Sequence, residues 1–233
     1  MADIHYLDNP LETEELLELL CPPVRNWFKD KFPDFTDPQK LAIPAIMDQE
    51  HLLLCSPTGS GKTLTAFLTI IDQLVRRALD NKLDKRVYCV YISPIKALAN
   101  DIQRNLIGPL TEISETYLPS RAQEIRVGLR TGDTPQSERQ KMLRNPPHIL
   151  ITTPESLAIA ITSPRFQPIV SEVEYMIVDE LHSLVPTKRG VHLALTLSYL
   201  DTLLNRPVQR IGISATMEPL ETVAEYLVSS DDR

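Results

Sequence analysis

The chain has 233 residues, of which 42% are apolar, 24% charged and 6% aromatic. A charged fraction near the globular average, without any low-complexity tract, excludes a disordered or fibrous protein and predicts one large domain or two small ones. The formal net charge of −7 argues against a protein that holds nucleic acid through a general positive field, so any contact with nucleic acid must be local.

The apolar runs are too short for a membrane protein. The longest, such as residues 87–93, fall well below the ~18–20 residues that a membrane span needs, and the first residues carry no secretion signal. We therefore expect a cytoplasmic protein without membrane contact. The three cysteines, Cys21, Cys55 and Cys89, are odd in number and widely spaced, which predicts reduced thiols rather than disulfides.

Two short helices are expected near the start of the chain. Residues 13–20 carry apolar side chains at helical spacing and precede two prolines, which cannot continue a helix, and residues 24–32 form a second amphipathic segment. We assign residues 1–34 to an N-terminal helical extension and residues 35–228 to the main domain. Residues 229–233 form a polar tail, which we expect to lie at the boundary of a piece cut from a longer protein.

From residue 35 onward, short apolar runs alternate with longer helical periods. The runs of strand length cover residues 52–55, 87–93, 125–129, 149–152, 176–178 and 210–214. The helical periods cover residues 62–78, 96–106, 136–143, 154–161, 191–204 and 220–227, while residues 106–121 receive no assignment. Continuously apolar strands separated by helices predict a doubly wound α/β fold, with a mostly parallel sheet and helices on both faces.

The strongest motif joins the first of these strands to the helix that follows it. We expect the backbone N–H groups of this glycine-rich turn at a helix N-terminus to surround phosphates, Lys62 to reach the β and γ oxygens, and the Thr63 hydroxyl to be offered to Mg²⁺. Ser56 stands where the pattern has its leading glycine, and a small residue there still allows the turn. The alternative is a surface loop between strand and helix. The residues of this phosphate loop that we expect to bind the nucleotide are Ser56, Thr58, Gly59, Ser60, Gly61, Lys62 and Thr63.

A second motif, Asp179-Glu180-Leu181-His182, follows an apolar strand. Ligands of open α/β sheets bind at the carboxyl ends of the strands, and two adjacent carboxylates tolerate each other there only near a cation or solvent. We expect Asp179 to be a magnesium ligand and Glu180 to orient and deprotonate the attacking water. Alone, the pair would indicate a solvated strand end; the phosphate loop in the same chain favours the catalytic interpretation.

The second motif resembles motif II of the superfamily 2 DExH-box helicases, and four further segments follow in the order of that family. Phe35 and Gln39 resemble its adenine-recognition motif, and the segments at Ser93, Thr153 and Ser214 resemble motifs Ia, Ib and III. The resemblance implies a RecA-like domain that uses ATP and Mg²⁺ to translocate on nucleic acid and unwind it, with 3′-to-5′ polarity. It also implies that His182 links to the γ-phosphate side, and that Ser214 and Thr216 couple the nucleotide state to strand movement.

Finer matches are similar to the large helicase-related group of bacteria and archaea, which implies a role in DNA repair or recombination. They lie in residues 93–101, 130–134 and 188–195. The Ski2-like and Hel-type helicases remain the alternative, since they share motif II and a nearby Arg-Gly pair.

Small hydroxyls, backbone amides and occasional cations at strand ends can bind successive phosphates without reading bases. The residues that we expect to contact single-stranded or partly duplex nucleic acid are Ser93, Lys96, Arg130, Thr131, Gly132, Thr153, Lys188 and Arg189. Ser93 and Thr153 could instead cap the following helices. Lys188 and Arg189 could be a solvated pair in a loop. The choice between DNA, RNA and a DNA–RNA hybrid stays open.

The resemblance also implies a second RecA-like domain, C-terminal to this one in the full-length protein. Such a domain supplies an arginine worth 10³–10⁵ in rate in related systems, so we expect this chain alone to bind nucleotide and barely hydrolyse it. The alternative from another class is a nucleotide-dependent binding module without motor activity; the complete set Lys62, Asp179 and Glu180 favours the enzyme.

Overall fold

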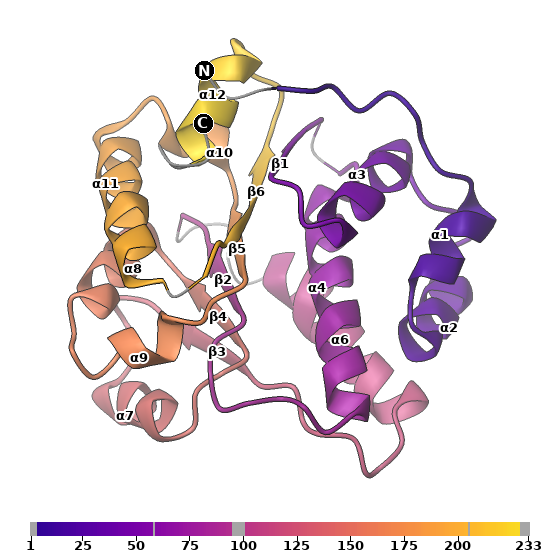
Figure 1. Cartoon of the computed structure of the whole chain (residues 1–233), viewed down its shortest axis with the longest axis horizontal. Coiled ribbons are helices and arrows are strands. Elements are labelled where there is room, and N and C mark those ends of the chain that lie inside the picture. Colours follow the sequence, from indigo (N-terminus) through magenta and orange to yellow (C-terminus); the bar gives the residue numbers. More distant parts are fainter. Residues whose placement is uncertain (1–3, 58, 95–100, 205, 229–233) are drawn as a thin grey trace.

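The computed structural model of the chain describes residues 4–57, 59–94, 101–204 and 206–228. A single sheet of six parallel strands lies between two layers of helices (Figure 1). The strands in chain order are β1 (Leu52–Cys55), β2 (Cys89–Ile92), β3 (Val127–Arg130), β4 (Ile149–Thr152), β5 (Tyr175–Val178) and β6 (Gln209–Ser214). Their order across the sheet is β1-β6-β5-β2-β4-β3, and the predicted doubly wound fold is confirmed.

Each central strand is buried on both faces, and this explains its continuously apolar sequence. In β2 the side chains of Cys89 and Tyr91 enter one hydrophobic core, while those of Val90 and Ile92 enter the other. Successive side chains of a strand point to opposite faces, so both sets must be apolar when helices cover both sides.

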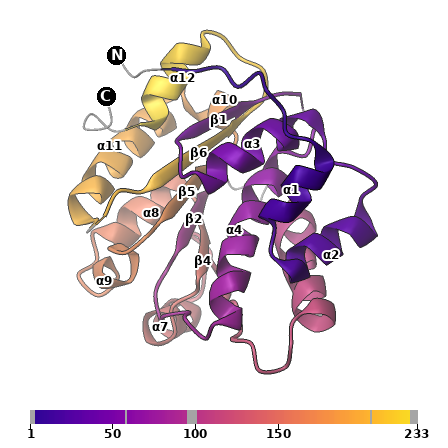
Figure 2. The ribbon, with the colours of Figure 1, turned by 45° about the vertical axis from the view of Figure 1, so that its right-hand side comes forward.

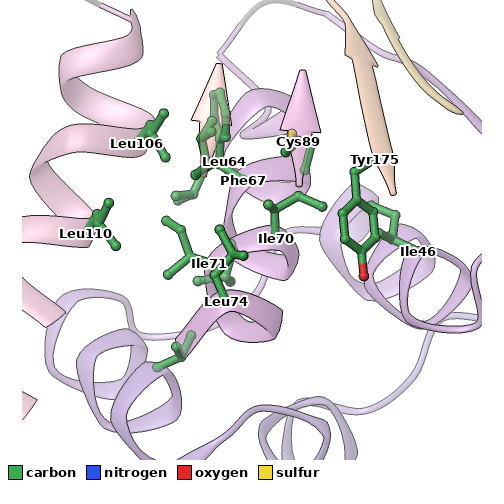
Figure 3. Close-up of a cluster of buried hydrophobic side chains, with 14 of the residues drawn as sticks. Ile46, Leu64, Phe67, Ile70, Ile71, Leu74, Cys89, Leu106, Leu110 and Tyr175 are labelled. Carbon is green, nitrogen blue, oxygen red and sulfur yellow. The ribbon is translucent and has the colours of Figure 1, made fainter. Parts of the chain in front are cut away.

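The first core lies beneath the helices of the first half of the chain. These elements are α1 (Thr13–Leu19), α2 (Pro22–Lys31), α3 (Asp37–Met47), α4 (Lys62–Leu79), the π-helical turn η2 (Gln103–Ile107), α6 (Gly108–Glu112) and the π-helical turn η3 (Ile113–Tyr117). Helix α4 lies at the centre of this layer: Phe67 and Ile70 lie near the strand residue Cys89, with Leu106 and Leu110 of the neighbouring helical segment nearby (Figure 3).

The second core lies on the opposite face of the sheet, which Figure 2 shows from a second angle. Its helices are α7 (Gln136–Arg144), α8 (Pro154–Ile161), α9 (Gln167–Val170), α10 (Leu181–Leu184), α11 (Lys188–Leu203) and α12 (Leu220–Leu227). No helix in the described ranges is both long enough and apolar enough to span a membrane. All three cysteines are free, as predicted, and burial raises the pKa of Cys21 to about 12.

Helices α1 and α2 share the first core with α4. Leu16, Val24 and Phe28 are buried in it. A buried carboxylate also ties the segment to α4: Asp72 accepts a hydrogen bond of 2.6 Å from the backbone N–H of Cys21 and pairs with Arg76 at 2.7 Å. The N-terminal residues and the sheet domain are therefore packed around one common interior.

Helix α2 begins at Pro22, two residues before its predicted start, because proline fits the first turn of a helix. Two further helical segments also differ from the sequence analysis. Helix α11 begins at Lys188, three residues before its predicted start, because the Thr187 side chain caps it by accepting from the N–H of Gly190 at 3.3 Å. The stretch 106–121, which received no assignment, is helical through Tyr117. The Gly108-Pro109 pair in it resembles a helix break. The helix continues past this pair because the chain makes a π-helical turn, in which the N–H of Gly108 reaches the carbonyl of Gln103. The first part of the predicted helix 96–106, residues 96–100, lies outside the described residues.

Gly190, in the first turn of α11, permits a close approach between two backbones. A Cβ atom there would lie 2.2 Å from the carbonyl oxygen of Leu184 and 2.8 Å from its carbon, which are backbone atoms that cannot turn aside. The Tyr226 hydroxyl of α12 donates to the Gly190 carbonyl at 2.7 Å, so three helices meet at this residue.

We expect Gly190→Ala to lower the melting temperature by several degrees, because overpacking costs about 1–3 kcal/mol and each kcal/mol corresponds to roughly 2–4 °C in a domain of this size. Gly132→Ala is the control, since a Cβ atom there meets none of the described residues within 4 Å. Thermal unfolding followed by circular dichroism measures both. Equal melting temperatures for the two variants would contradict the packing argument.

Candidate nucleotide-binding and catalytic site

The expected site residues gather at one edge of the sheet because all six strands run in the same direction. The order β1-β6-β5 sets three segments side by side: the phosphate loop after β1, Ser214-Ala215-Thr216 at the end of β6, and Asp179-Glu180 after β5. The second and third segments are adjacent because β5 pairs with β6. Most of the expected nucleic-acid residues follow β2, β4 and β3, in the other half of the same edge.

The phosphate loop is held closed by its own side chains. Lys62 is 8% exposed, and its amine donates to the carbonyl of Ser56 and, at 2.7 Å, to the carbonyl of Pro57. The Ser56 hydroxyl, in the position of the missing glycine, lies 2.6 Å from that of Ser60. Burial lowers the pKa of Lys62, against the opposing effect of Asp179 and Glu180. Thr58 lies outside the described residues.

The start of α3 rests against this loop. Thr36 donates from its hydroxyl to the carbonyl of Ser60 at 3.1 Å, and its backbone N–H donates to Gln39 Oε1 at 2.9 Å. Gln39 is 4% exposed, with its Nε2 close to Gly61. The Phe35 ring, also buried, stacks on Phe28 with 3.8 Å between centroids. Phe35 thus lies in the core and fixes the start of α3, while Gln39 reaches the loop itself.

Asp179 is the most constrained of the expected catalytic groups. It is 5% exposed; one carboxylate oxygen accepts from the backbone N–H of Glu180 at 2.7 Å and the other accepts from the hydroxyl of Tyr91. Burial raises the pKa of Asp179 to about 6, although both hydrogen bonds act to lower it. Glu180 has a left-handed backbone with φ of 55°, which costs about 1–3 kcal/mol for a residue with a side chain and is concentrated at functional sites.

His182 connects the end of β5 to the end of β6. Its Nδ1 accepts from the backbone N–H of Ala215 at 3.0 Å, so the proton of the neutral ring is on Nε2. That nitrogen lies 3.1 Å from Glu180 Oε2. The imidazole therefore forms a continuous path from the candidate base to the middle residue of the Ser214-Ala215-Thr216 segment. Ser214 is buried and donates to the sulfur of Met217 at 3.2 Å, whereas Thr216 is exposed.

The donor set fits magnesium bound together with a nucleotide. Among the described residues no group of three or more His, Cys, Asp or Glu side chains could hold a metal alone. Mg²⁺ takes oxygen ligands and is usually bound through one or two carboxylates plus the phosphates of a substrate, with several waters retained. Asp179, Glu180 and the half-buried Thr63 are oxygen donors of this kind.

The expected nucleic-acid residues differ in how they are presented. Thr153 caps α8 by accepting from the N–H of Ser156 at 3.3 Å, so its capping role is real, and Ser93 is buried. Thr131 and Gly132 lie in a turn that Arg139 of α7 holds through hydrogen bonds to three backbone carbonyls, among them Gly132 at 2.9 Å. Nothing in the sequence pattern distinguishes Arg139 from other surface arginines.

Two of the three described cations among the expected nucleic-acid residues are buried or paired. Arg130 is 8% exposed, with its guanidinium 4.7 Å from the centre of the Phe166 ring, and burial lowers its pKa; it does not present a free charge to solvent. Lys188 and Arg189 lie in the first turn of α11 rather than in a loop, and Arg189 pairs with Glu155 at 2.6 Å. Lys188 is exposed, and Lys96 lies outside the described residues.

Comparisons with known proteins identify relatives of this chain by sequence and by structure. A model of the DEAD/DEAH box helicase family matches residues 36–225. The ATP-dependent helicase Lhr-Core of Methanocaldococcus jannaschii is 50% identical over 99% of this chain and 27% of its own, and the Lhr helicase/uracil glycosylase of Escherichia coli is 46% identical over 94% and 15%. A structure of Mycobacterium smegmatis helicase Lhr bound to ssDNA and AMP-PNP superposes with a TM-score of 0.81 at 44% identity, over 92% of this chain and 27% of that one.

The phosphate loop, the paired carboxylates and the parallel sheet define a nucleotide-binding domain of the RecA-like type, and the chain belongs to the DEAD/DEAH box helicase family. Within that family it is similar to the large helicase-related proteins, as predicted. The chain spans about a quarter of the length of the first of these relatives, the Lhr-Core helicase.

The turn at Gly61 offers a test of the loop geometry. Gly59 and Gly61 both have left-handed backbones, with φ of 84° and 85°. Among the described residues, a Cβ atom at Gly61 would meet Gln39 Nε2 at 3.2 Å, whereas one at Gly59 would meet nothing within 4 Å. We therefore expect Gly61→Ala to weaken ADP binding more than Gly59→Ala, because it adds displacement of Gln39 to the same backbone strain. Calorimetric titration measures both affinities. A Gly59→Ala variant that binds more weakly than Gly61→Ala would contradict this account.

Proposed function

We propose that this chain is the ATP-binding motor domain of an ATP-dependent helicase that translocates on nucleic acid and unwinds it. The observation that carries the proposal is the placement of the phosphate loop and the Asp179-Glu180 pair at one sheet edge, two strands apart, with the end of β6 between them. The relatives that are named ATP-dependent helicases support it, as does the relative whose structure holds ssDNA and AMP-PNP.

Different residues of the chain have separate roles in nucleotide binding and hydrolysis. On nucleotide binding, the Lys62 amine exchanges two loop carbonyls for phosphate oxygens, and the backbone N–H groups of the loop take the remaining phosphate charge. Asp179 and Thr63 would hold Mg²⁺, which would supply positive charge to neutralise the phosphates. Glu180 orients a water molecule and takes its proton, and Gln39 contacts the adenine edge.

Hydrolysis is coupled to movement through His182. Any displacement of the Glu180 carboxylate on loss of the γ-phosphate acts on the imidazole and, through its Nδ1, on the backbone of Ala215. This segment ends β6, and Ser214 and Thr216 on either side transmit the change. A second RecA-like domain in the full-length protein supplies the arginine that completes catalysis, so the present chain alone is nearly inactive.

The substrate is single-stranded or partly duplex nucleic acid, DNA or a DNA–RNA hybrid, read through its phosphates and traversed with 3′-to-5′ polarity. Hydroxyl and amide groups after β2, β4 and β3 form the phosphate track, with Lys188 as an exposed cation. The similarity to the large helicase-related proteins supports a role in DNA repair or recombination, in the interior of a bacterial or archaeal cell.

Substitution of the candidate base in the full-length protein tests this mechanism. We expect Glu180→Gln to bind ATP normally while its turnover falls by roughly 10²–10⁴, because the shape is kept and the base is lost. Lys62→Ala should lose nucleotide binding itself. A steady-state ATPase assay with parallel nucleotide titration separates the two variants, and near-normal turnover of Glu180→Gln would assign the base elsewhere.

The salt dependence of single-strand binding tests the phosphate track. We expect Lys188→Ala in the full-length protein to flatten the slope of log K against log salt by about 0.7, the value for one phosphate contact on a single strand. Lys85→Ala removes the same charge from an exposed position just before β2, at the opposite edge of the sheet, and should leave the slope unchanged. Equal slopes for both variants, measured by fluorescence anisotropy, would remove Lys188 from the track.

A further inference from the structure

Tyr91 is a buried polar residue that sequence patterns place in the core and that the structure places at the site. It belongs to β2, which pairs with β5, and its side chain is 1% exposed. Its ring packs on Phe67 of α4, with 4.8 Å between centroids and 38° between planes. Its hydroxyl donates to Asp179. One side chain therefore touches both the helix that begins at the phosphate loop and the carboxylate that follows β5.

The hydrogen bonds fix the orientation of the Asp179 carboxylate. Oδ1 accepts from the N–H of Glu180 at 2.7 Å, and Oδ2 accepts from Tyr91, which is the only side-chain donor to Asp179 in the described part of the chain. With each oxygen tied to a different element, the carboxyl plane cannot rotate without breaking one of the bonds. Because the group is 5% exposed, solvent cannot replace a lost donor freely.

The ring contact adds a second restraint. Phe67 lies four residues after Thr63 on α4, so it is on the same face of that helix, one turn further along. Through the contact with Phe67 and the bond to Asp179, Tyr91 links the two elements that carry the expected magnesium oxygens, Thr63 and Asp179.

We propose that Tyr91 is a positioning residue for magnesium: it aims the Asp179 carboxylate so that a Mg²⁺–nucleotide complex binds more tightly than the nucleotide alone. This inference rests on the proposed function, because it assumes that Asp179 contributes to the magnesium site. Hydrogen-bond partners of metal-binding carboxylates are typically worth 10–100-fold in metal affinity.

The test is the coupling between magnesium and ADP in this chain, which requires no turnover. The ratio of ADP dissociation constants, measured by calorimetry in EDTA and in saturating Mg²⁺, reports that coupling directly. We expect Tyr91→Phe to reduce the ratio roughly tenfold relative to the unsubstituted chain, with ADP affinity in EDTA little changed.

Tyr88→Phe is the matched control. Tyr88 is another 1% exposed tyrosine, just before β2, and its hydroxyl accepts from the N–H of Asp84 at 2.8 Å, at the end of the strand away from the site. It should lose thermal stability comparably and keep the full coupling ratio. If Tyr91 has a merely structural role, both variants will have lower melting temperatures and unchanged coupling ratios, and this result would overturn the proposal. Equal losses of coupling in the two variants would also overturn it.

Two further results are distinguishable from these. Absence of coupling in the unsubstituted chain would overturn the magnesium site itself, and the inference with it. Should Tyr91→Phe fail to fold, Phe67→Leu carries the same test, because it keeps the hydroxyl and removes the ring that holds it. Reduced coupling in that variant supports the proposal, and coupling equal to that of the unsubstituted chain overturns it.

Discussion

The common direction of the six strands is the constraint on which the candidate site depends. In a parallel sheet every strand delivers its carboxyl end to the same edge, and every return connection crosses a face, so both faces must be apolar and covered. The chemistry is then confined to the connections that leave that edge. This is why residues as distant in sequence as Lys62, Asp179 and Ser214 share a site.

Interactions within the chain hold the groups of the candidate site in place. The Lys62 amine is satisfied by carbonyls of its own loop, and the backbone of Glu180 is held in a left-handed conformation. The carboxylate of Asp179 is held at both oxygens, by the Tyr91 hydroxyl and by the backbone N–H of Glu180. In the proposed function the Lys62 amine changes its partners when nucleotide binds, while the Asp179 carboxylate is already oriented, and this orientation would reduce the ordering required at the moment of binding.

Sequence patterns predict the fold almost completely, because hydrophobic periodicity and turn residues are local signals. The bounds of β1, β4, α8 and α12 are as predicted. The start of α11 was missed because a threonine cap outweighs the polar pair that follows it. Sequence motifs also select the residues of the candidate site, but they do not predict the environments of those residues. The burial of Arg130 on Phe166 and the bond from Tyr91 to Asp179 each join residues more than thirty positions apart, which no local pattern encodes. Tyr91 in an apolar strand looks like any other core residue.

The sharing of one interior by the N-terminal helices and α4 has a practical consequence for work with the isolated domain. The family model begins at residue 36, and a recombinant fragment started there would lack α1 and α2. The face of α4 that those helices cover would then be open to water, together with the buried carboxylate of Asp72, whose partner at Cys21 would be gone. A contiguous apolar surface of this kind promotes self-association, so such a fragment would aggregate although every catalytic motif is present.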